Sequence, residues 1–208
     1  MSDTEAVSNA SPEPAVSEPS DLWGLGSSPD EALTNADAQL RADIRRMGNL
    51  LGMDVLGQHR CHFRLASGAL DLEVPGDEAR HELLAGRRGH PYVEVNWPGV
   101  SGLACWDTGA GATVVNRAFW LEHPGIFEPI GTSAGTDAHG EQVETPLLLM
   151  SGPVIGQRTF GSHKAVAVDL SGVNSTLDYP MDLILGYPTI RQADWLFDFP
   201  ARRWAVTS

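Results

Sequence analysis

The stretch YVEVNWPGVSGLACWDTGAGATVV, residues 92–115, decides the fold. Tyr92 to Asn96 and Gly102 to Trp106 are strand-like runs, and a turn from Trp97 to Val100 joins them. The second run leads directly into Asp107, which is followed by a small hydroxyl residue and a glycine. This order places a carboxylate on a tight turn whose backbone can be approached closely.

Several other runs along the chain alternate in the same way or are short and apolar, with Gly and Pro turn signals between them. The Gly-rich stretch from Gly131 to Gly140 is one of the predicted turns. Short strands at this spacing predict a mainly β domain, either a barrel or a sandwich. The runs are Leu70–Val74, Val166–Leu170, Leu183–Gly186, Trp195–Phe199 and Trp204–Val206.

The chain upstream of this region has a different composition. Residues 1–30 hold six acids, four prolines and no Lys or Arg, so we expect a disordered acidic tail over residues 1–28. Ser28, Pro29 and Glu31 then form a capping box, and an apolar stripe from Leu33 to Leu51 follows at helical spacing. We therefore expect an amphipathic helix and linker over residues 29–57 and the β domain over residues 58–208.

The overall charge and apolar content exclude some classes of function. The 208 residues carry a formal net charge of −13, which argues against nucleic-acid binding because phosphate affinity depends on Lys and Arg. The longest aliphatic run, Leu147–Met150, is far too short to cross a membrane, and the first residues lack a signal-peptide pattern. We expect a soluble, cytoplasmic protein with no membrane partner. Cys61 and Cys105 are too few for a disulfide scaffold, so both are expected as reduced, buried thiols.

Three ordered parts of the sequence resemble the retropepsin-like aspartic proteases of the single-domain bacterial and retroviral type. They are D-T-G-A at Asp107–Ala110, the Gly-rich stretch Gly131–Gly140 where the family has its flap, and L-I-L-G at Leu183–Gly186. The resemblance covers roughly residues 60–207 and implies the retropepsin-like acid protease β-barrel. Trp106 departs from the family habit, which is Leu, Ile or Val before the Asp.

The resemblance implies an aspartic endopeptidase. In this family two Asp carboxylates share a proton and activate a water that attacks the peptide carbonyl. This chain has one D-T-G and no D-S-G, so the implied unit is a homodimer that places Asp107 beside its symmetry mate. The implied substrate is a peptide or protein, and neither a cofactor nor a metal is implied. A catalytically silent dimer with the same fold, acting as a peptide-binding or regulatory module, remains the alternative.

The same carry-over gives roles to the residues around Asp107. Thr108 is implied to hydrogen-bond across the dimer, Gly109 to admit the substrate, and the whole turn to support the catalytic carboxylate. The implied residues are Asp107 for catalysis, Thr108, Gly109 and Ala110 for the loop, Leu185 and Gly186 for packing behind it, and Gly135 and Gly140 for the flap.

Three simpler interpretations compete with these. Asp107 could be an ordinary turn residue, since Asp and Gly dominate turns. Gly131–Gly135 matches the G-x-S-x-G elbow of serine hydrolases, with His139 and His163 as available bases, but lacks the preceding strand and following helix. His59, Cys61 and His62 could suggest a metal site, but no second ligand pair lies nearby.

Overall fold

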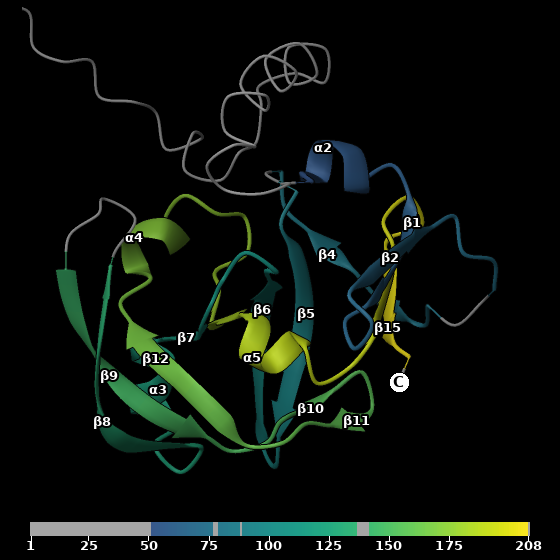
Figure 1. The fold of residues 1–208 in the computed structure, drawn as a ribbon. Helices are drawn as coiled ribbons and strands as arrows, with labels where there is room; N and C mark the ends of the chain where they lie inside the picture. Colours follow the sequence, from purple (N-terminus) through teal and green to yellow (C-terminus); the bar gives the residue numbers. More distant parts are fainter. Residues whose placement is uncertain (1–50, 77–78, 88, 137–141, 208) are drawn as a thin grey trace, which may run out of the picture.

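The computed structural model describes residues 51–76, 79–87, 89–136 and 142–207 (Figure 1). The expected tail over residues 1–28 and the expected helix up to residue 50 lie outside the described residues, as do Gly140 and His139. The described chain begins with a short helix, α2 (Met53–Leu56), between Gly52 and Gly57. Leu56 is buried in the main core, and its carbonyl accepts a hydrogen bond from Cys61 Sγ at 3.7 Å.

One of the two sheets has five strands and joins the two ends of the described chain. Its order is β2-β1-β14-β15-β3, so the last two strands, β14 and β15, each have a neighbour from this chain on both sides. The strand pairings in the described part of this sheet are all antiparallel. The strands are β1 (Arg60–Arg64), β2 (Ala69–Leu72), β3 (His81–Glu82), β14 (Trp195–Asp198) and β15 (Arg203–Val206).

The second sheet has ten strands and carries the D-T-G turn. Its order is β11-β10-β5-β6-β13-β7-β12-β9-β8, with β4 paired to β5. Two short helices, α3 (Arg117–Glu122) and α4 (Ser171–Asn174), connect its strands, and a third, α5 (Tyr187–Ile190), leads from β13 to β14 of the five-stranded sheet. The strands are β4 (Leu84–Ala85), β5 (Pro91–Trp97), β6 (Val100–Trp106), β7 (Thr113–Asn116), β8 (Phe127–Thr136), β9 (Gln142–Met150), β10 (Val154–Ile155), β11 (Arg158–Thr159), β12 (His163–Val168) and β13 (Leu183–Leu185).

The insertion of β13 between β6 and β7 sets the geometry of the site. β13 runs parallel to β6 and antiparallel to β7, with Leu185 opposite Trp106 and Leu183 opposite Val115. The loop from Asp107 to Ala112 connects the two strands that flank β13. The two ends of the loop are therefore fixed by β6 and β7. Strand β13 ends at Leu185, between these two strands.

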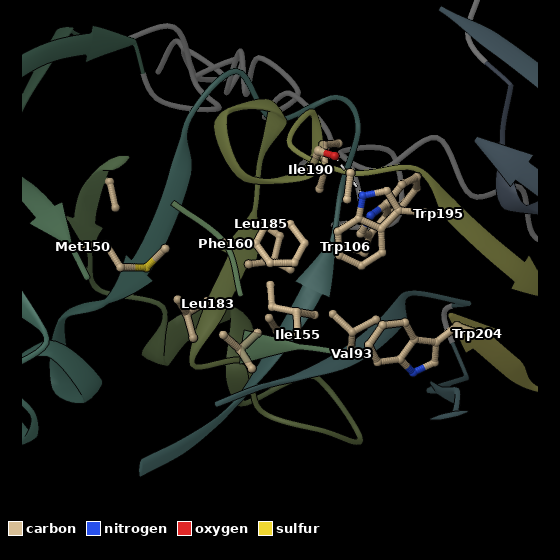
Figure 2. Packing of buried hydrophobic residues seen from close by; sticks show 14 of the residues in the cluster. Val93, Trp106, Met150, Ile155, Phe160, Leu183, Leu185, Ile190, Trp195 and Trp204 are labelled. Carbon is tan, nitrogen blue, oxygen red and sulfur yellow. Dashed lines mark hydrogen bonds between the residues drawn. The ribbon is translucent and has the colours of Figure 1, made fainter. Parts of the chain in front are cut away.

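The core lies on both faces of β6, because successive side chains of a strand point to opposite faces. Trp106 packs in the larger cluster, with Trp195 and Trp204 (Figure 2), while Cys105 packs in a smaller cluster with Tyr92 and Ile184. A strand covered on both faces reads as a nearly continuous apolar run, which explains the sequence L-A-C-W before Asp107.

The mainly β fold expected from the sequence is confirmed, and the β5–β6 and β14–β15 hairpins lie where the pattern predicts them. Over the residues that the structure describes, both sheets are open. The predicted turn at residues 131–136 is wrong, because these residues continue strand β8. Gly131 instead sits at a bulge with a φ of 139°, a conformation suited to glycine. Cys61 and Cys105 are free and buried, as expected.

Candidate active site

Asp107 stands at the end of β6, and its position is fixed by backbone hydrogen bonds. Its N–H donates to the Leu185 carbonyl at 3.1 Å, which extends the β6–β13 pairing by one residue. Its carboxylate Oδ1 accepts the Gly109 N–H at 2.8 Å, and its carbonyl accepts the Ala110 N–H at 3.4 Å. The half-buried carboxylate is therefore held in one orientation by the turn that follows it.

The segment after β13 closes the back of this loop. The Tyr187 N–H donates to the Ala110 carbonyl at 2.8 Å. A Cβ on Gly186 would collide with the Ala112 carbonyl and lie 2.7 Å from the Ala110 carbonyl oxygen. Only glycine fits at this close approach of two backbones. The structure thus brings Asp107, Ala110, Leu185 and Gly186 into one cluster.

The front of the loop is open. Thr108, Gly109 and Gly111 are exposed, and a Cβ on Gly111 would meet no atom within 4 Å. The neighbouring Tyr187 side chain is 50% exposed. The loop therefore presents small groups outward while its backbone is tied from behind, and a second molecule can approach Asp107 from this side.

A cavity of about 260 Å³ lies between the β4–β5 loop and the loop after α4. Tyr92 lines it and pairs in register with Cys105, two residues before Asp107. Across the cavity Arg87 and Asp178 join the two loops: the Arg87 Nε–H donates to Asp178 Oδ1 at 2.8 Å, and the Arg87 N–H to Oδ2 at 2.7 Å. The sequence pattern did not point to these residues, because Arg87 and Asp178 are 91 positions apart.

The chemistry of the cavity wall is set by burial. Burial first, and then the charges of Cys105 and Asp178, raise the pKa of Tyr92 to about 12. Tyr92 thus keeps its proton through the neutral range. Its ring makes edge contacts with His90 and Tyr179, with centroids 6.5 and 5.8 Å apart. The wall beside β6 is therefore aromatic and uncharged at Tyr92.

A second carboxylate, Asp182, lies along β6 but is engaged elsewhere. Its Oδ2 accepts the Leu103 N–H at 2.9 Å, and its own N–H donates to the Leu103 carbonyl at 2.8 Å. Burial is the main cause that raises the pKa of Asp182. Leu103 precedes Asp107 by four residues, which is about 13 Å along a strand. Asp182 therefore stabilises the start of the β6–β13 pairing. It lies too far along the strand to share a proton with Asp107.

The remaining sequence expectations lie on other elements. Gly135 is in β8, opposite Val143 of β9, so the stretch expected as a flap is a β-hairpin whose tip, including Gly140, lies outside the described residues. The G-x-S-x-G match also lies within β8 and is not a strand-to-helix elbow. His59 contacts Glu73 and His62 contacts Thr207, while Cys61 is buried, so these three side chains do not converge.

Comparison with known proteins gives structural neighbours only. No family model matches the chain, and no curated protein matches it. The chain is similar to the retroviral protease-like domain of Ddi1 from Leishmania major, at 14% identity and a TM-score of 0.34, over 57% of this chain and 94% of that one. It is similar to the simian foamy virus protease, at 22% identity and a TM-score of 0.31, over 48% of this chain and 90% of that one.

A third neighbour is a retropepsin-like aspartic protease from Rickettsia conorii, at 19% identity and a TM-score of 0.34, over 51% of this chain and 82% of that one. Identities of 14 to 22% and TM-scores of 0.31 to 0.34 assign no function. Among the described residues, no helix is long and apolar enough to cross a membrane.

Proposed function

We propose that this chain is an aspartic endopeptidase that hydrolyses peptide bonds as a homodimer. One observation supports the proposal above others: a carboxylate held at the end of a buried strand, oriented by Leu185 and Gly109, on a loop that is open in front. In the proposed dimer the two Asp107 side chains face each other across the two-fold axis. They share one proton, because two carboxylates in such close proximity cannot both be ionised.

The proposed reaction follows from that shared proton. One carboxylate accepts a proton from a water held between the two, and the water attacks the peptide carbonyl. The other carboxylate donates its proton to the carbonyl oxygen, which carries the developing negative charge. The first carboxyl group then passes its proton to the leaving nitrogen, while the second takes a proton back from a hydroxyl of the tetrahedral intermediate. The C–N bond breaks, an amine and a carboxylic acid leave, and the pair again holds one proton.

The need for a second chain is supported by the surroundings of Asp107. Asp182 is held by Leu103, and the chain has a single D-T-G. The partner carboxylate is therefore assigned to a symmetry mate. Thr108 is exposed, and we assign the two-fold contact to Thr108 and its loop because β14 and β15 already have strand neighbours on both sides.

The test is cleavage of a diverse peptide library from about pH 4 to 7 by the full chain and by Asp107→Asn. We expect Asp107→Asn to lower the rate at least about 10³-fold while sizing shows the same dimer, because the substitution removes the general base and keeps the shape. Asp71→Asn is the matched control, since Asp71 lies in a surface ion pair with Arg64. A wild-type dimer that cuts nothing would replace this proposal with the catalytically silent peptide-binding module.

A further inference from the structure

Two buried hydroxyls lie behind the Asp107 loop. They belong to Thr113 and Thr189, and both residues are 0% exposed. Their Oγ1 atoms are 2.6 Å apart. An unpaired buried hydroxyl costs about 1–3 kcal/mol, so such groups are kept where a partner satisfies them. The location of this pair is therefore informative.

The pair continues into a histidine. His163 Nε2 lies 2.6 Å from Thr189 Oγ1, and His163 Nδ1 lies 2.8 Å from the Gly161 carbonyl oxygen. Nδ1 has two polar neighbours: the Gly161 carbonyl, which only accepts, and the Gln192 side-chain nitrogen, which lies farther away at 3.2 Å and donates to the Pro188 carbonyl. We therefore assign the proton to Nδ1, directed at the closer Gly161 carbonyl, so that Nε2 accepts from the Thr189 hydroxyl. The Thr189 oxygen then accepts from the Thr113 hydroxyl. In this arrangement every proton of the chain Thr113, Thr189, His163 has one acceptor.

The opposite tautomer breaks this order. A proton on Nε2 would donate to Thr189 and turn its hydroxyl toward Thr113, whose own proton would then lose its acceptor within the three residues. Burial, with Arg191 nearby, lowers the pKa of His163, although the bond to the Gly161 carbonyl acts in the other direction. The neutral ring protonated at Nδ1 is thus the form that fits.

Gln192 fixes the place of this ring from a third side. The Gln192 side-chain oxygen accepts the Gly161 N–H at 2.8 Å, and its NH₂ donates to the Pro188 carbonyl at 2.9 Å. Gln192 thereby ties the segment before β12 to α5 and keeps the Gly161 carbonyl directed at His163. The imidazole is consequently held between two elements and has little freedom to turn.

The hydroxyl chain connects the two segments that hold Asp107. Thr113 is the first residue of β7 and ends the loop that Asp107 begins. Thr189 lies in α5, three residues after Gly186, and its N–H donates to the Gly186 carbonyl at 3.0 Å. The Leu185 and Tyr187 backbone bonds tie the near part of the loop, and the Thr113–Thr189 bond ties its far end.

We propose that Thr113, Thr189 and His163 are positioning residues that hold the Asp107 loop in the geometry its carboxylate needs. Their effect on catalysis rests on the proposed function, whereas their effect on the loop does not. A displacement of about 1 Å at a reacting group lowers the catalytic rate severely. Loss of the hydrogen bonds among these three residues should therefore change kcat more than substrate binding.

The first experiment needs no destabilising variant. Nitrogen-15 NMR of the full chain reports which ring nitrogen of His163 carries the proton, with the resonance assigned by its loss in His163→Gln. We expect Nδ1–H at neutral pH. A ring protonated at Nε2 would overturn the proposal, because the hydroxyl chain could not then be satisfied.

The second experiment compares Thr189→Val, which keeps the shape and removes the hydroxyl, with Thr189→Ser, which keeps the hydroxyl. Thr145→Val is the matched control, since it removes a hydroxyl bond to the Ser133 carbonyl in the β8–β9 hairpin. We expect amide exchange at Asp107 and Tyr187 to rise roughly 10-fold in Thr189→Val and to stay within about 3-fold of wild type in the other two. Equal exchange in all three variants would leave these residues with a packing role only.

Activity gives a separate readout. If the wild type cleaves peptides, Thr189→Val is expected to lower kcat about 10-fold with KM nearly unchanged, and Thr189→Ser to restore it. A rise in KM with kcat unchanged would contradict the proposal. If the wild type cleaves nothing, the proposed function fails, while the tautomer and the amide exchange still decide the positioning role.

Discussion

Trp106 and Asp107 are adjacent in the chain and belong to two regions with opposite construction. Trp106 packs in a cluster of aromatic rings that includes Trp195 (Figure 2). Its ring centroid lies 4.8 Å from those of Phe63 and Phe197. Asp107 begins a loop of small residues whose front is exposed. One region is held by side chains and the other by backbone hydrogen bonds.

The difference shows how a loop can be both open and well placed. Thr, Gly and Ala side chains are too small to anchor the loop by packing, and larger ones would cover the carboxylate. Packing instead holds the preceding residue, Trp106. The loop itself is held from behind by hydrogen bonds of Leu185, Tyr187 and Thr113. Substitutions in the aromatic region should therefore mainly lower stability, and substitutions at the loop should mainly lower activity.

The largest effect is expected from Trp195→Ala in the aromatic region. Trp195 is 0% exposed, its ring lies about 6 Å from Trp106 and Trp204, and its Nε1–H donates to the Ile190 carbonyl at 2.8 Å. Truncation leaves a large cavity and removes a buried hydrogen bond, so we expect a loss of about 3–5 kcal/mol in the free energy of unfolding, measured by urea denaturation.

Tyr187→Ala is the control for that change, because it removes an aromatic ring that is half exposed beside the loop. It should cost less than about 1 kcal/mol. A Trp195→Ala protein as stable as Tyr187→Ala would mean that the aromatic cluster does not carry the stability of the fold.

Gly186→Ala is expected to have a smaller effect on stability and a larger one on the loop. The added methyl would collide with the Ala112 and Ala110 carbonyls, so the loop backbone must shift. We expect about 1–3 kcal/mol of destabilisation, as for other overpacked sites, together with a loss of peptide cleavage of about 10²-fold. Urea denaturation and the peptide assay measure the two separately.

Gly111→Ala is its matched control, since a Cβ at Gly111 meets nothing within 4 Å. It should leave both quantities within about 0.5 kcal/mol and twofold of wild type. Equal losses in the two variants would show that the loop tolerates no methyl anywhere, and that the close approach behind Gly186 has no special importance.

The sequence predicted one of these regions better than the other. Alternation and the Pro-Gly turn located the β5–β6 hairpin, and the aromatic run near the C-terminus located β14 and β15, because periodicity reports which residues share a face. The same signal does not report which strand lies beside which. The passage of β13 between β6 and β7 is a tertiary feature, and the Leu185 bond to Asp107 follows from it.

The polar residues behind the loop were also beyond sequence reasoning. Thr residues are mostly exposed in proteins, so Thr113 and Thr189, 76 positions apart, carry no sequence signal of their shared burial. His163 was considered only as a possible base for a serine hydrolase, whereas the structure places it against Thr189. Glycine is frequent in turns and also occurs at strand bulges, so the Gly-rich sequence predicts a turn over residues 131–136, where the structure has strand β8.

The smallest predicted effect is a change in the pKa of Cys105, the buried thiol of β6, caused by the charge of Asp107 at the end of the same strand. Burial, and then the charge of Asp107, raise the pKa of Cys105 to about 12, while burial and then Glu73 raise that of Cys61 to about 11. The folded protein therefore holds these protons more tightly than the unfolded chain between about pH 9 and 12, so the free energy of unfolding falls as the pH rises through that range.

Asp107→Asn separates the two thiols. It removes the negative charge beside Cys105 and leaves Cys61 untouched, so we expect the pKa of Cys105 to fall by a fraction of a unit and that of Cys61 to stay constant. Thiolate absorbance against pH, with Cys61→Ala and Cys105→Ala to assign each titration, measures the shift. An unchanged Cys105 titration would mean that solvent screens Asp107 from the interior, and the open loop would then be electrostatically separate from the core that holds it.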